Sequence, residues 1–402
     1  MSILEARERR GLKMKALTSS SLTWITIKAN AISSIRLHPL MSSMVVIAYD
    51  ELLSTIPLSK QEATLDAEGL VIYVSTTLGG KEAKKRCVSL EENHPIGRLV
   101  DLDVFEGGCS ISRSELGIAP RLCFLCEQMA AQCVRSKTHD ISLIEAYSLK
   151  EARDYLLKTQ GRSAMFGMVA ELTRLRTYGC VGVMHSGVHV DMDFFTYLAS
   201  MRVLWHQFDL MDHQMTGNFT QLRAFGQRIE AHMFEATYGK NTHKGAIFLF
   251  LFAISADMAK KSIQKRIEHI RWLASEVKKD FDQTPLTYGL FASKSYSIVS
   301  IRHLVLDGLS WVYQTLVPMI GVSEDELMAN IISCIDDTTT LKRSDLATLR
   351  FLQSWAKELL SRREYDSMKE MDDYYMKHRL SSGGCADIYA LAYYIALREG
   401  IV

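Results

Sequence analysis

The stretch that decides the fold of the larger part of this chain is 237-TYGKNTHKGAIFLFLF-252. Its polar opening precedes an apolar run, residues 245–258, which is too short to span a bilayer and is typical of a buried core helix. We expect Asn241 or Thr242 to cap this helix. Lys244 falls in the first turn, where a cation opposes the helix dipole, so we predict that an anion such as a phosphate binds there. The alternative is an ordinary cap.

The preceding segment, 221-QLRAFGQRIEAHMFEAT-237, predicts an amphipathic helix. Its buried stripe is expected to contain four residues: Leu222, Phe225, Ile229 and Met233. Arg223 and Glu230 lie seven residues apart and therefore share a different face.

The pattern outside these segments divides the chain in two. From about residue 149 onward, apolar residues recur at spacings of three and four and proline is scarce, which predicts an all-α domain. Before it, β-branched runs at 22–28, 43–48 and 70–76 predict strands that alternate with helices. We therefore expect an α+β domain with a mixed sheet at residues 1–150 and a helical domain at 160–402.

Composition excludes several classes of function. The chain has 402 residues, 48% hydrophobic and 23% charged, as expected of a soluble globular protein. A formal net charge of +1 provides no overall field for nucleic acid or an anionic membrane. The charged N-terminus lacks the apolar core of a signal peptide, and eight dispersed cysteines suggest reduced thiols, so we expect a cytoplasmic protein.

A first acidic motif lies in 94-HPIGRLVDLDVFEGG-108. In a strand, Asp101 and Asp103 would share one face, where two carboxylates can hold Mg²⁺ against a di- or triphosphate. Arg98 would neutralise phosphate oxygens. The alternative is a strand with two solvated aspartates.

A cysteine-rich motif follows at Cys123, Cys126, Cys133 and His139. These are the ligand types of a structural Cys3His zinc site. However, 126–133 also resembles one helix, in which Cys126, Met129 and Cys133 would form a buried stripe. Both interpretations stay open.

Three polar motifs occur in the helical half. His189, Asp191 and Asp193 precede an apolar-periodic helix and form either a second Mg²⁺ site or a cap. Gly383 and Gly384 allow the backbone to approach a ligand, and Asp387 follows in the opening turns of a helix. For the glycine motif, the alternative is an ordinary helix start. The acidic pair 336–337 with Arg343 forms a further candidate group at a turn between helices.

The N-terminal motifs together resemble one enzyme family. GRLVDLDV, ISRSELG (111–117) and the Arg-x-Cys-x2-Cys…Cys-x-Arg…His series are similar to apo-citrate lyase phosphoribosyl-dephospho-CoA transferase. This resemblance implies a nucleotidyltransferase-like domain that transfers a phosphoribosyl-dephospho-CoA arm to a serine of the citrate lyase acyl carrier subunit, releasing pyrophosphate. It also implies that Asp101 and Asp103 bind metal and are catalytic. The family's Asn…Pro-Gly…Lys loop is NAISSIR here, with Asn30 kept and Arg36 at the Lys position.

The C-terminal motifs resemble triphosphoribosyl-dephospho-CoA synthase. The longest match is Leu-Arg-x2-Gly-x3-Glu-x2-Met-x3-Thr-x-Gly-x-Asn-Thr-His-Lys-Gly over 222–245, and shorter matches cover 187–193, 337–343 and 381–387. The implied reaction converts ATP and 3′-dephospho-CoA to 2′-(5″-triphosphoribosyl)-3′-dephospho-CoA and adenine. The implied catalytic residues are Glu230 as a base and Lys244. The implied substrate contacts of the synthase are His189, Arg223, Asn241, His243, Arg343, Gly383, Gly384 and Asp387, with Mg²⁺ at Asp191 and Asp193, whereas Arg98 is a substrate contact of the transferase motif.

Two segments depart from the synthase pattern. The Pro-Lys-Pro-Gly-Leu-Val-Asp run is 176-RTYGCVG-182, which keeps Gly179 and loses the Lys and the Asp. The Gly-x-Arg-Gly-Glu-Ala motif, expected near 288–300, retains only Lys294 in place of its Arg. The leading hypothesis is a bifunctional enzyme, because the product of the second half is the substrate of the first. The alternatives are an active transferase with a degenerate nucleotide-binding or scaffolding half, and a zinc-containing interaction protein.

Overall fold

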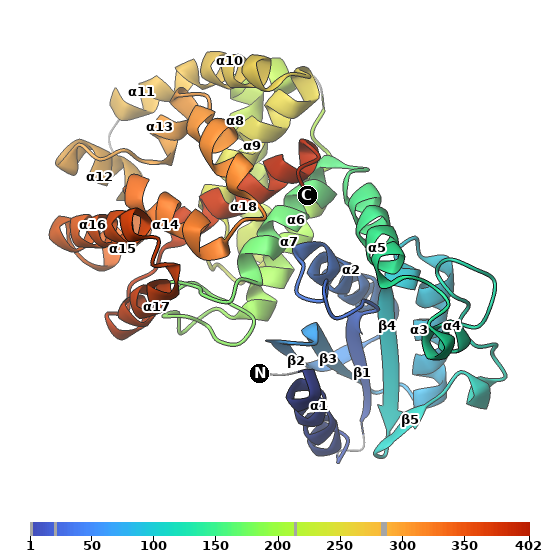
Figure 1. Cartoon of the computed structure of the whole chain (residues 1–402). Coiled ribbons are helices and arrows are strands. Elements are labelled where there is room, and N and C mark those ends of the chain that lie inside the picture. The colour runs from blue at the N-terminus through green and yellow to red at the C-terminus, as the bar shows by residue number, and fades with distance from the viewer. Residues whose placement is uncertain (1–2, 20–21, 213–214, 283–287) are drawn as a thin grey trace. The chain divides into compact units, whose positions relative to one another are not determined.

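The chain forms two compact units, which we call the first unit (Met1–Leu156) and the second unit (Leu157–Val402) (Figure 1). The computed structural model describes residues 3–19, 22–212, 215–282 and 288–402. An α+β first unit and a helical second unit confirm the expected fold class.

The first unit is built on a five-stranded sheet of order β2-β3-β1-β4-β5, in which all the paired strands are antiparallel. The expectation of a mixed sheet is wrong in this detail. The strands are β1 (Thr23–Ala29), β2 (Leu58–Asp66), β3 (Gly69–Thr76), β4 (Val100–Glu106) and β5 (Cys109–Ile111). The helices are α1 (Ile3–Leu17), α2 (Pro39–Thr55), α3 (Gly80–Asn93), α4 (Ala130–Ser136) and α5 (Ile141–Leu156).

The predicted strand at 43–48 is wrong, because this run lies inside the buried helix α2. Pro39 occupies the first turn of the helix, and the Nδ1 atom of His38 accepts a hydrogen bond from the backbone N–H of Leu40 at 3.2 Å. Helix α2 packs against β1 and β3 and is buried along most of its length. A short apolar run of this kind has no periodicity that separates a strand from a fully buried helix.

One face of the sheet carries both an apolar cluster and the acidic motif. Trp24 and Val71 pack against Met14 of α1, and Phe105 joins this cluster. The register pairs Trp24 with Phe105 and Lys28 with Asp101. Because side chains repeat every two residues, the acidic pair of β4 lies on the same face, beyond the apolar cluster.

The second unit is entirely helical among its described residues. Its helices are α6 (Gln160–Leu172), α7 (Phe194–Phe208), α8 (Phe219–Ala236), α9 (Lys244–Ala259), α10 (Ile263–Ala274), α11 (Lys278–Asp282), α12 (Tyr288–Tyr296), α13 (Ile301–Leu306), α14 (Glu324–Cys334), α15 (Thr338–Arg343), α16 (Leu346–Arg362), α17 (Met368–Lys377) and α18 (Gly383–Arg398). Within the described ranges, every helix is too short or too polar to cross a lipid bilayer.

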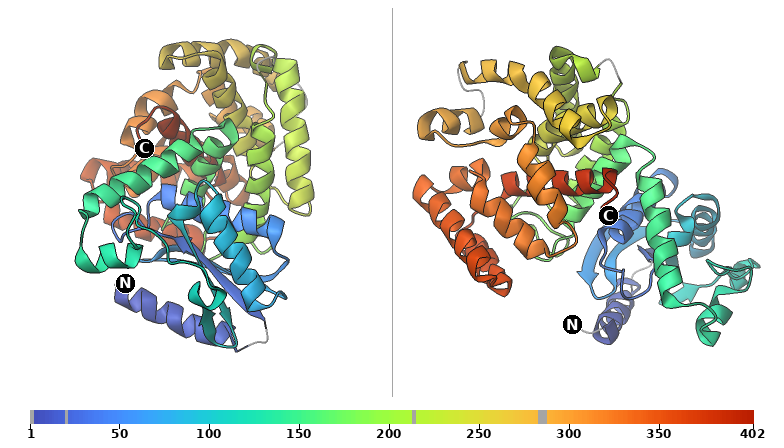
Figure 2. Two further views of the ribbon diagram at one scale, coloured as in Figure 1. Left: turned by 90° about the vertical axis from the view of Figure 1, so that its right-hand side faces the viewer. Right: turned by 45° about the horizontal axis from the view of Figure 1, so that its top comes forward.

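The core of the second unit lies around α6, α9 and α18 (Figure 2). Helices α6 and α18 pack side by side, and a Cβ at Gly167 would collide with the carbonyl of Ala390. Helix α9 is apolar on all sides, as expected of a helix surrounded by protein. The predicted buried helix in the opening stretch is therefore confirmed.

Candidate functional site

A cavity of about 500 Å³ lies in the second unit, where the start of α9 meets α8, α13 and α18. This volume is within the usual range for small-molecule sites. Apolar side chains such as Phe219, Phe248 and Leu251 form part of its wall. The predicted residues that line it are His189, Arg223, Glu230, Asn241, His243, Lys244, Gly383 and Asp387. Four sequence-distant motifs therefore meet at one cavity.

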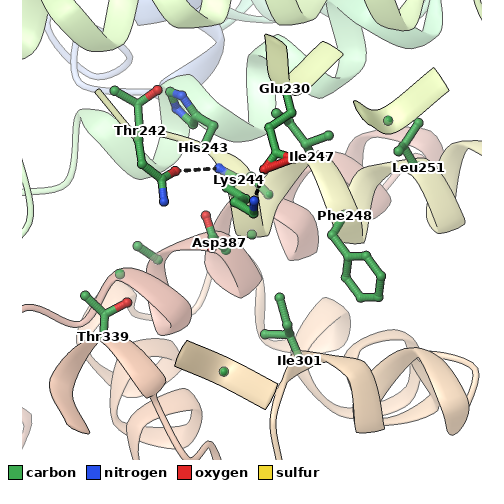
Figure 3. Close-up of a pocket in the computed structure, with 18 of the residues that line it drawn as sticks. Glu230, Thr242, His243, Lys244, Ile247, Phe248, Leu251, Ile301, Thr339 and Asp387 are labelled. Atoms are coloured by element: carbon green, nitrogen blue, oxygen red, sulfur yellow. Dashed lines mark hydrogen bonds and ion pairs between the residues drawn. The ribbon is translucent and has the colours of Figure 1, made fainter. Parts of the chain in front are cut away.

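Lys244 forms an ion pair with Glu230 at the cavity wall (Figure 3). Arg223, Gly226 and Glu230 all line the cavity, so the face of α8 predicted from their spacing is the face turned toward it. The anion that compensates Lys244 within the protein is thus the Glu230 carboxylate. The predicted apolar stripe of α8 is buried, and its Leu222 also lines the cavity.

The start of α9 is capped by two separate groups. The N-cap residue is His243, so the expected cap at Asn241 or Thr242 is wrong in position. The Oδ1 atom of Asn241 nevertheless accepts a hydrogen bond from the backbone N–H of Lys244 at 3.3 Å. The backbone N–H of Ala246 donates to Asp387 of α18. Gly245 permits this approach, because a Cβ there would collide with the Asp387 carboxylate. Burial, and then the nearby Glu171 and Asp337, raise the pKa of Asp387 well above its ordinary value.

His243 is a neutral, buried member of the site. Its side chain is 4% exposed, and burial lowers its pKa to about 3. The Thr242 hydroxyl donates to Ser200 at 2.8 Å, and the Ser200 hydroxyl lies 2.7 Å from Nδ1 of His243. With Ser200 donating its own proton to Nδ1, the Nε2 atom carries the hydrogen, and among the residues that the structure describes it has no hydrogen-bond partner. His243 is therefore a neutral donor rather than a cationic phosphate ligand.

Arg302 and Asp280 belong to the site but were missed in the sequence. Arg223 donates to Asp280 at 2.6 Å and stacks on the Phe219 ring at 4.6 Å. Arg302 of α13 lies 3.8 Å from the same carboxylate, and burial lowers its pKa. Lys294, expected to replace a family arginine, is exposed and lies outside the cavity lining. Arg302 and Arg223 lie on different helices far apart in the chain, so no regular spacing of residues predicts that they share a site.

A buried ion pair beneath the cavity was also missed. Arg174 donates to Glu171 at 2.8 Å, and its guanidinium lies 4.9 Å from the Tyr389 ring centroid. Both partners are almost fully buried, and Glu171 lines the cavity. Burial raises the pKa of Glu171 and outweighs the opposing effect of Arg174.

The second acidic motif serves mainly as a helix cap. Asp193 Oδ1 accepts from the backbone N–H of Thr196 at 2.8 Å in a capping box at the start of α7. Both Asp191 and Asp193 are exposed and lie outside the cavity lining. His189 lines the cavity, and its Nδ1 atom lies 3.3 Å from Nη2 of Arg343. Burial and then Arg343 lower the pKa of His189.

Asp337 joins the start of α15 to the start of α18. Its carboxylate accepts from the backbone N–H groups of Thr339 at 2.7 Å and Cys385 at 2.9 Å. Gly384 lies against this carboxylate, while Gly383 faces the cavity. The glycine pair and Asp337 therefore place α18, and with it Asp387.

The Asp101 and Asp103 side chains of the first unit share one face of β4, as their alternation predicted. Both Oδ2 atoms converge on Nζ of Lys28, at 2.8 and 2.7 Å. Burial alone lowers the pKa of Lys28, but Asp101 and Asp103 outweigh it, and the net pKa is raised. Two converging carboxylate oxygens are ligands of the kind that Mg²⁺ prefers, and in this structure they share the Lys28 ammonium.

Arg98 and Arg121 both have partners within the protein. Arg98 Nη2 donates to the carbonyls of Leu122 and Cys123, each at 2.7 Å. Arg121 pairs with the buried Glu91 and lies 3.7 Å from Asp101. Glu91 also accepts from the backbone N–H of Leu102 at 2.9 Å, so it fixes β4 beside the arginines. The predicted phosphate contact of Arg98 is thus engaged with the cysteine-rich segment.

The four residues of the cysteine-rich motif come together in space. The ligand atoms of Cys123, Cys126, Cys133 and His139 all lie within 4.8 Å of one another. The helix expected over 126–133 is wrong, because α4 begins only at Ala130. A single helical stripe therefore does not account for this cluster.

Comparison with known proteins finds two families in this chain. Residues 1–155 match the family described as apo-citrate lyase phosphoribosyl-dephospho-CoA transferase, and residues 158–401 match ATP:dephospho-CoA triphosphoribosyl transferase. The protein CitXG of Haemophilus influenzae is 27% identical over 99% of this chain and 96% of its own length. CitXG of Leuconostoc mesenteroides subsp. cremoris is 28% identical over 100% of this chain and 97% of its own length. An Escherichia coli apo-citrate lyase phosphoribosyl-dephospho-CoA transferase is 40% identical over 21% of this chain and 47% of its own.

Proposed function

Because the chain belongs to the ATP:dephospho-CoA triphosphoribosyl transferase family and carries an apo-citrate lyase phosphoribosyl-dephospho-CoA transferase domain before it, we propose that it makes and attaches the citrate lyase prosthetic group. The second unit would convert ATP and 3′-dephospho-CoA to 2′-(5″-triphosphoribosyl)-3′-dephospho-CoA and adenine. The first unit would transfer the phosphoribosyl-dephospho-CoA arm to a serine of the citrate lyase acyl carrier subunit and release pyrophosphate.

The observation that carries the first step is the charge arrangement of the cavity in the second unit. Arg223 and Arg302 meet at Asp280, and Lys244 lies at the start of α9. A triphosphate would displace these protein carboxylates as the partner of the cations, and aromatic side chains of the wall would contact the adenine. The unpartnered Nε2–H of His243 supplies a further neutral donor.

Two carboxyl groups provide the proton transfers that this step needs. The 2′-hydroxyl of dephospho-CoA forms a bond to the anomeric carbon of ATP, and the bond from that carbon to adenine breaks. Glu230 would accept the hydroxyl proton, with Lys244 orienting its carboxylate. Asp387, whose pKa burial raises well above its ordinary value, would give a proton to the departing adenine.

For the second step, the residues of the first unit that would hold Mg²⁺ are Asp101 and Asp103. When bound, the ion would neutralise phosphate oxygens and polarise the phosphorus under attack. The serine hydroxyl of the carrier subunit forms a bond to the phosphorus next to the ribose, and the bond from that phosphorus to pyrophosphate breaks. Pyrophosphate leaves with the electrons of the broken bond and takes up the hydroxyl proton. Lys28 would move from the carboxylates to a phosphate oxygen as the ion enters. Arg121, beside Asp101, adds positive charge at the same place.

Incubation of the purified chain with ATP, Mg²⁺ and dephospho-CoA tests the proposal. We expect adenine release without the carrier subunit, and labelling of that subunit with pyrophosphate release when it is added. Chromatography detects adenine, and mass spectrometry detects the modified serine. If no adenine forms while preformed triphosphoribosyl-dephospho-CoA is still transferred, the first reaction is wrong for this chain. The degenerate second unit then becomes the better account, consistent with the altered segment at 176–182.

A further inference from the structure

The segment 112–140 of the first unit has an inverted burial pattern. Only two of its residues are buried, Cys123 at 8% and Cys133 at 6% exposed. Several of its larger aliphatic side chains are exposed, with Val134 at 74% and Leu122 at 49%. A segment that buries thiols and exposes aliphatic side chains gains little from hydrophobic packing. Its conformation requires another source of stabilisation.

The buried thiols face other metal-ligand atoms rather than apolar side chains. The Sγ atoms of Cys126 and Cys133 are 3.5 Å apart, too far for a disulfide, and Nε2 of His139 lies 3.3 Å from Sγ of Cys126. The backbone N–H of Leu125 points to Sγ of Cys123 at 3.5 Å. Sulfur ligands at about 2.3 Å from a tetrahedral zinc lie roughly 3.8 Å apart, so the cluster has the dimensions of a zinc site.

We propose that Cys123, Cys126, Cys133 and His139 bind one structural Zn²⁺ ion. All four positions of a tetrahedral ion are filled by the protein, so no position remains for water or substrate. Three thiolates and a neutral imidazole favour zinc over the hard cation Mg²⁺. The proposal is independent of the reactions assigned to the two units.

The ion would fix the loop that positions two arginines of the first unit. Arg98 donates to the carbonyls of Leu122 and Cys123, next to and within the proposed ligand set. Arg121 lies two residues before the first ligand, and its carbonyl accepts from the backbone N–H of Ala130. Zinc binding would therefore hold Arg121 near Asp101, and Arg98 against the ligand loop, without contact between the ion and the substrate.

Metal analysis of the full-length chain, expressed with zinc and purified by gel filtration, tests the site. We expect one zinc per chain and eight free thiols after denaturation without reductant. The Cys126→Ser variant should lose the zinc. Cys109→Ser, which changes an exposed cysteine of the same unit, is the matched control and should keep it. Replacement of zinc by Co²⁺ should give thiolate-to-cobalt charge-transfer absorption that the Cys126→Ser variant lacks.

A readout on the unaltered chain covers the case in which the variant does not fold. Chelation of the metal should expose 112–140 to limited proteolysis, and added Zn²⁺ should restore its protection. Chain that carries no zinc, or fewer than eight free thiols because a disulfide has formed, would overturn the proposal. Equal zinc in Cys126→Ser and Cys109→Ser would overturn it as well.

Discussion

Asp387 is the side chain on which the proposed adenine-forming step depends most directly. Its pKa is raised, so the proton is lost only as pH rises well above the ordinary aspartate range, and adenine formation should fall on that alkaline side. In Asp387→Asn we expect a roughly 10²–10⁴-fold loss of kcat. The fall of kcat at alkaline pH that deprotonation of Asp387 causes should also be absent from this variant. Adenine release measured across pH checks both effects.

The asparagine variant also separates chemistry from structure. Its amide oxygen can still accept the Ala246 N–H, so the start of α9 keeps its cap. We therefore expect unchanged ATP binding by calorimetry. A variant with near-normal kcat would show that another group protonates adenine.

At the acidic pair of the first unit, Lys28 competes with a metal ion. Removing its charge in Lys28→Met leaves two carboxylates without their cation, so Mg²⁺ should stabilise this variant more than the parent. Thermal unfolding with and without Mg²⁺ measures the difference. Lys13→Met is the matched control, because Lys13 pairs with a single carboxylate, Glu62, at 2.7 Å. Equal responses to Mg²⁺ in both variants would contradict a metal site at Asp101 and Asp103.

The residues of both sites differ in how far the sequence could reveal them. Alternation alone predicted that Asp101 and Asp103 share a face, because that relation is local. Lys28 lies opposite them only through the register of β1 with β4, which no local pattern reports. Arg302 was missed because its place in the site likewise depends on tertiary packing rather than on a local pattern. The helix-start argument at Lys244 predicted a bound phosphate, which stays a prediction, and the anion beside Lys244 in this structure is the Glu230 carboxylate from α8.

At the scale of elements, the spacing of apolar residues predicted helices correctly where one face of the helix is buried. It failed where all faces are buried. Helix α8 was predicted with its stripe, since its two faces differ in polarity. The run at 43–48 lies in α2, which is buried on nearly every side and carries no such contrast. The clearest available signal was Pro39 at the start of the helix, because proline favours the first helical turn.

The connection between α8 and α9 should make the second unit sensitive to acid. His243 has a pKa of about 3 when folded and an ordinary value near 6.5 when unfolded. Its contribution to stability is therefore present above pH 6.5 and is lost as pH falls toward 3. We expect the free energy of unfolding to fall by up to about 1.4 kcal/mol per pH unit in that window from this group.

Urea unfolding of the parent and His243→Gln at several pH values isolates the effect of His243. The glutamine cannot take up a proton, so the difference in unfolding free energy between the two proteins should shrink as pH falls from 6.5. A difference that stays constant with pH would show that His243 is not held neutral by burial. Ser200, which contacts the ring, has no charge of its own and does not add to the slope.

For the whole molecule, joining both activities in one chain raises the local concentration of an intermediate near its consumer. With labelled ATP, dephospho-CoA and the carrier subunit, we expect the label on the subunit to be diluted only weakly by added unlabelled triphosphoribosyl-dephospho-CoA. An equimolar mixture of Asp103→Asn and Asp387→Asn chains is the comparison, because each full-length variant retains one reaction. Equal dilution in the parent and the mixture would show that the intermediate equilibrates with the solution first.

Gly245 shows how a residue without a functional group can govern a reaction. Its missing side chain is the space that the Asp387 carboxylate occupies, so even a methyl group there would push the acid away from α9. The ion pair of Lys244 with Glu230 lies on another side of the helix and would remain. A random mutational screen for adenine release should therefore find position 245 about as intolerant as the acid itself.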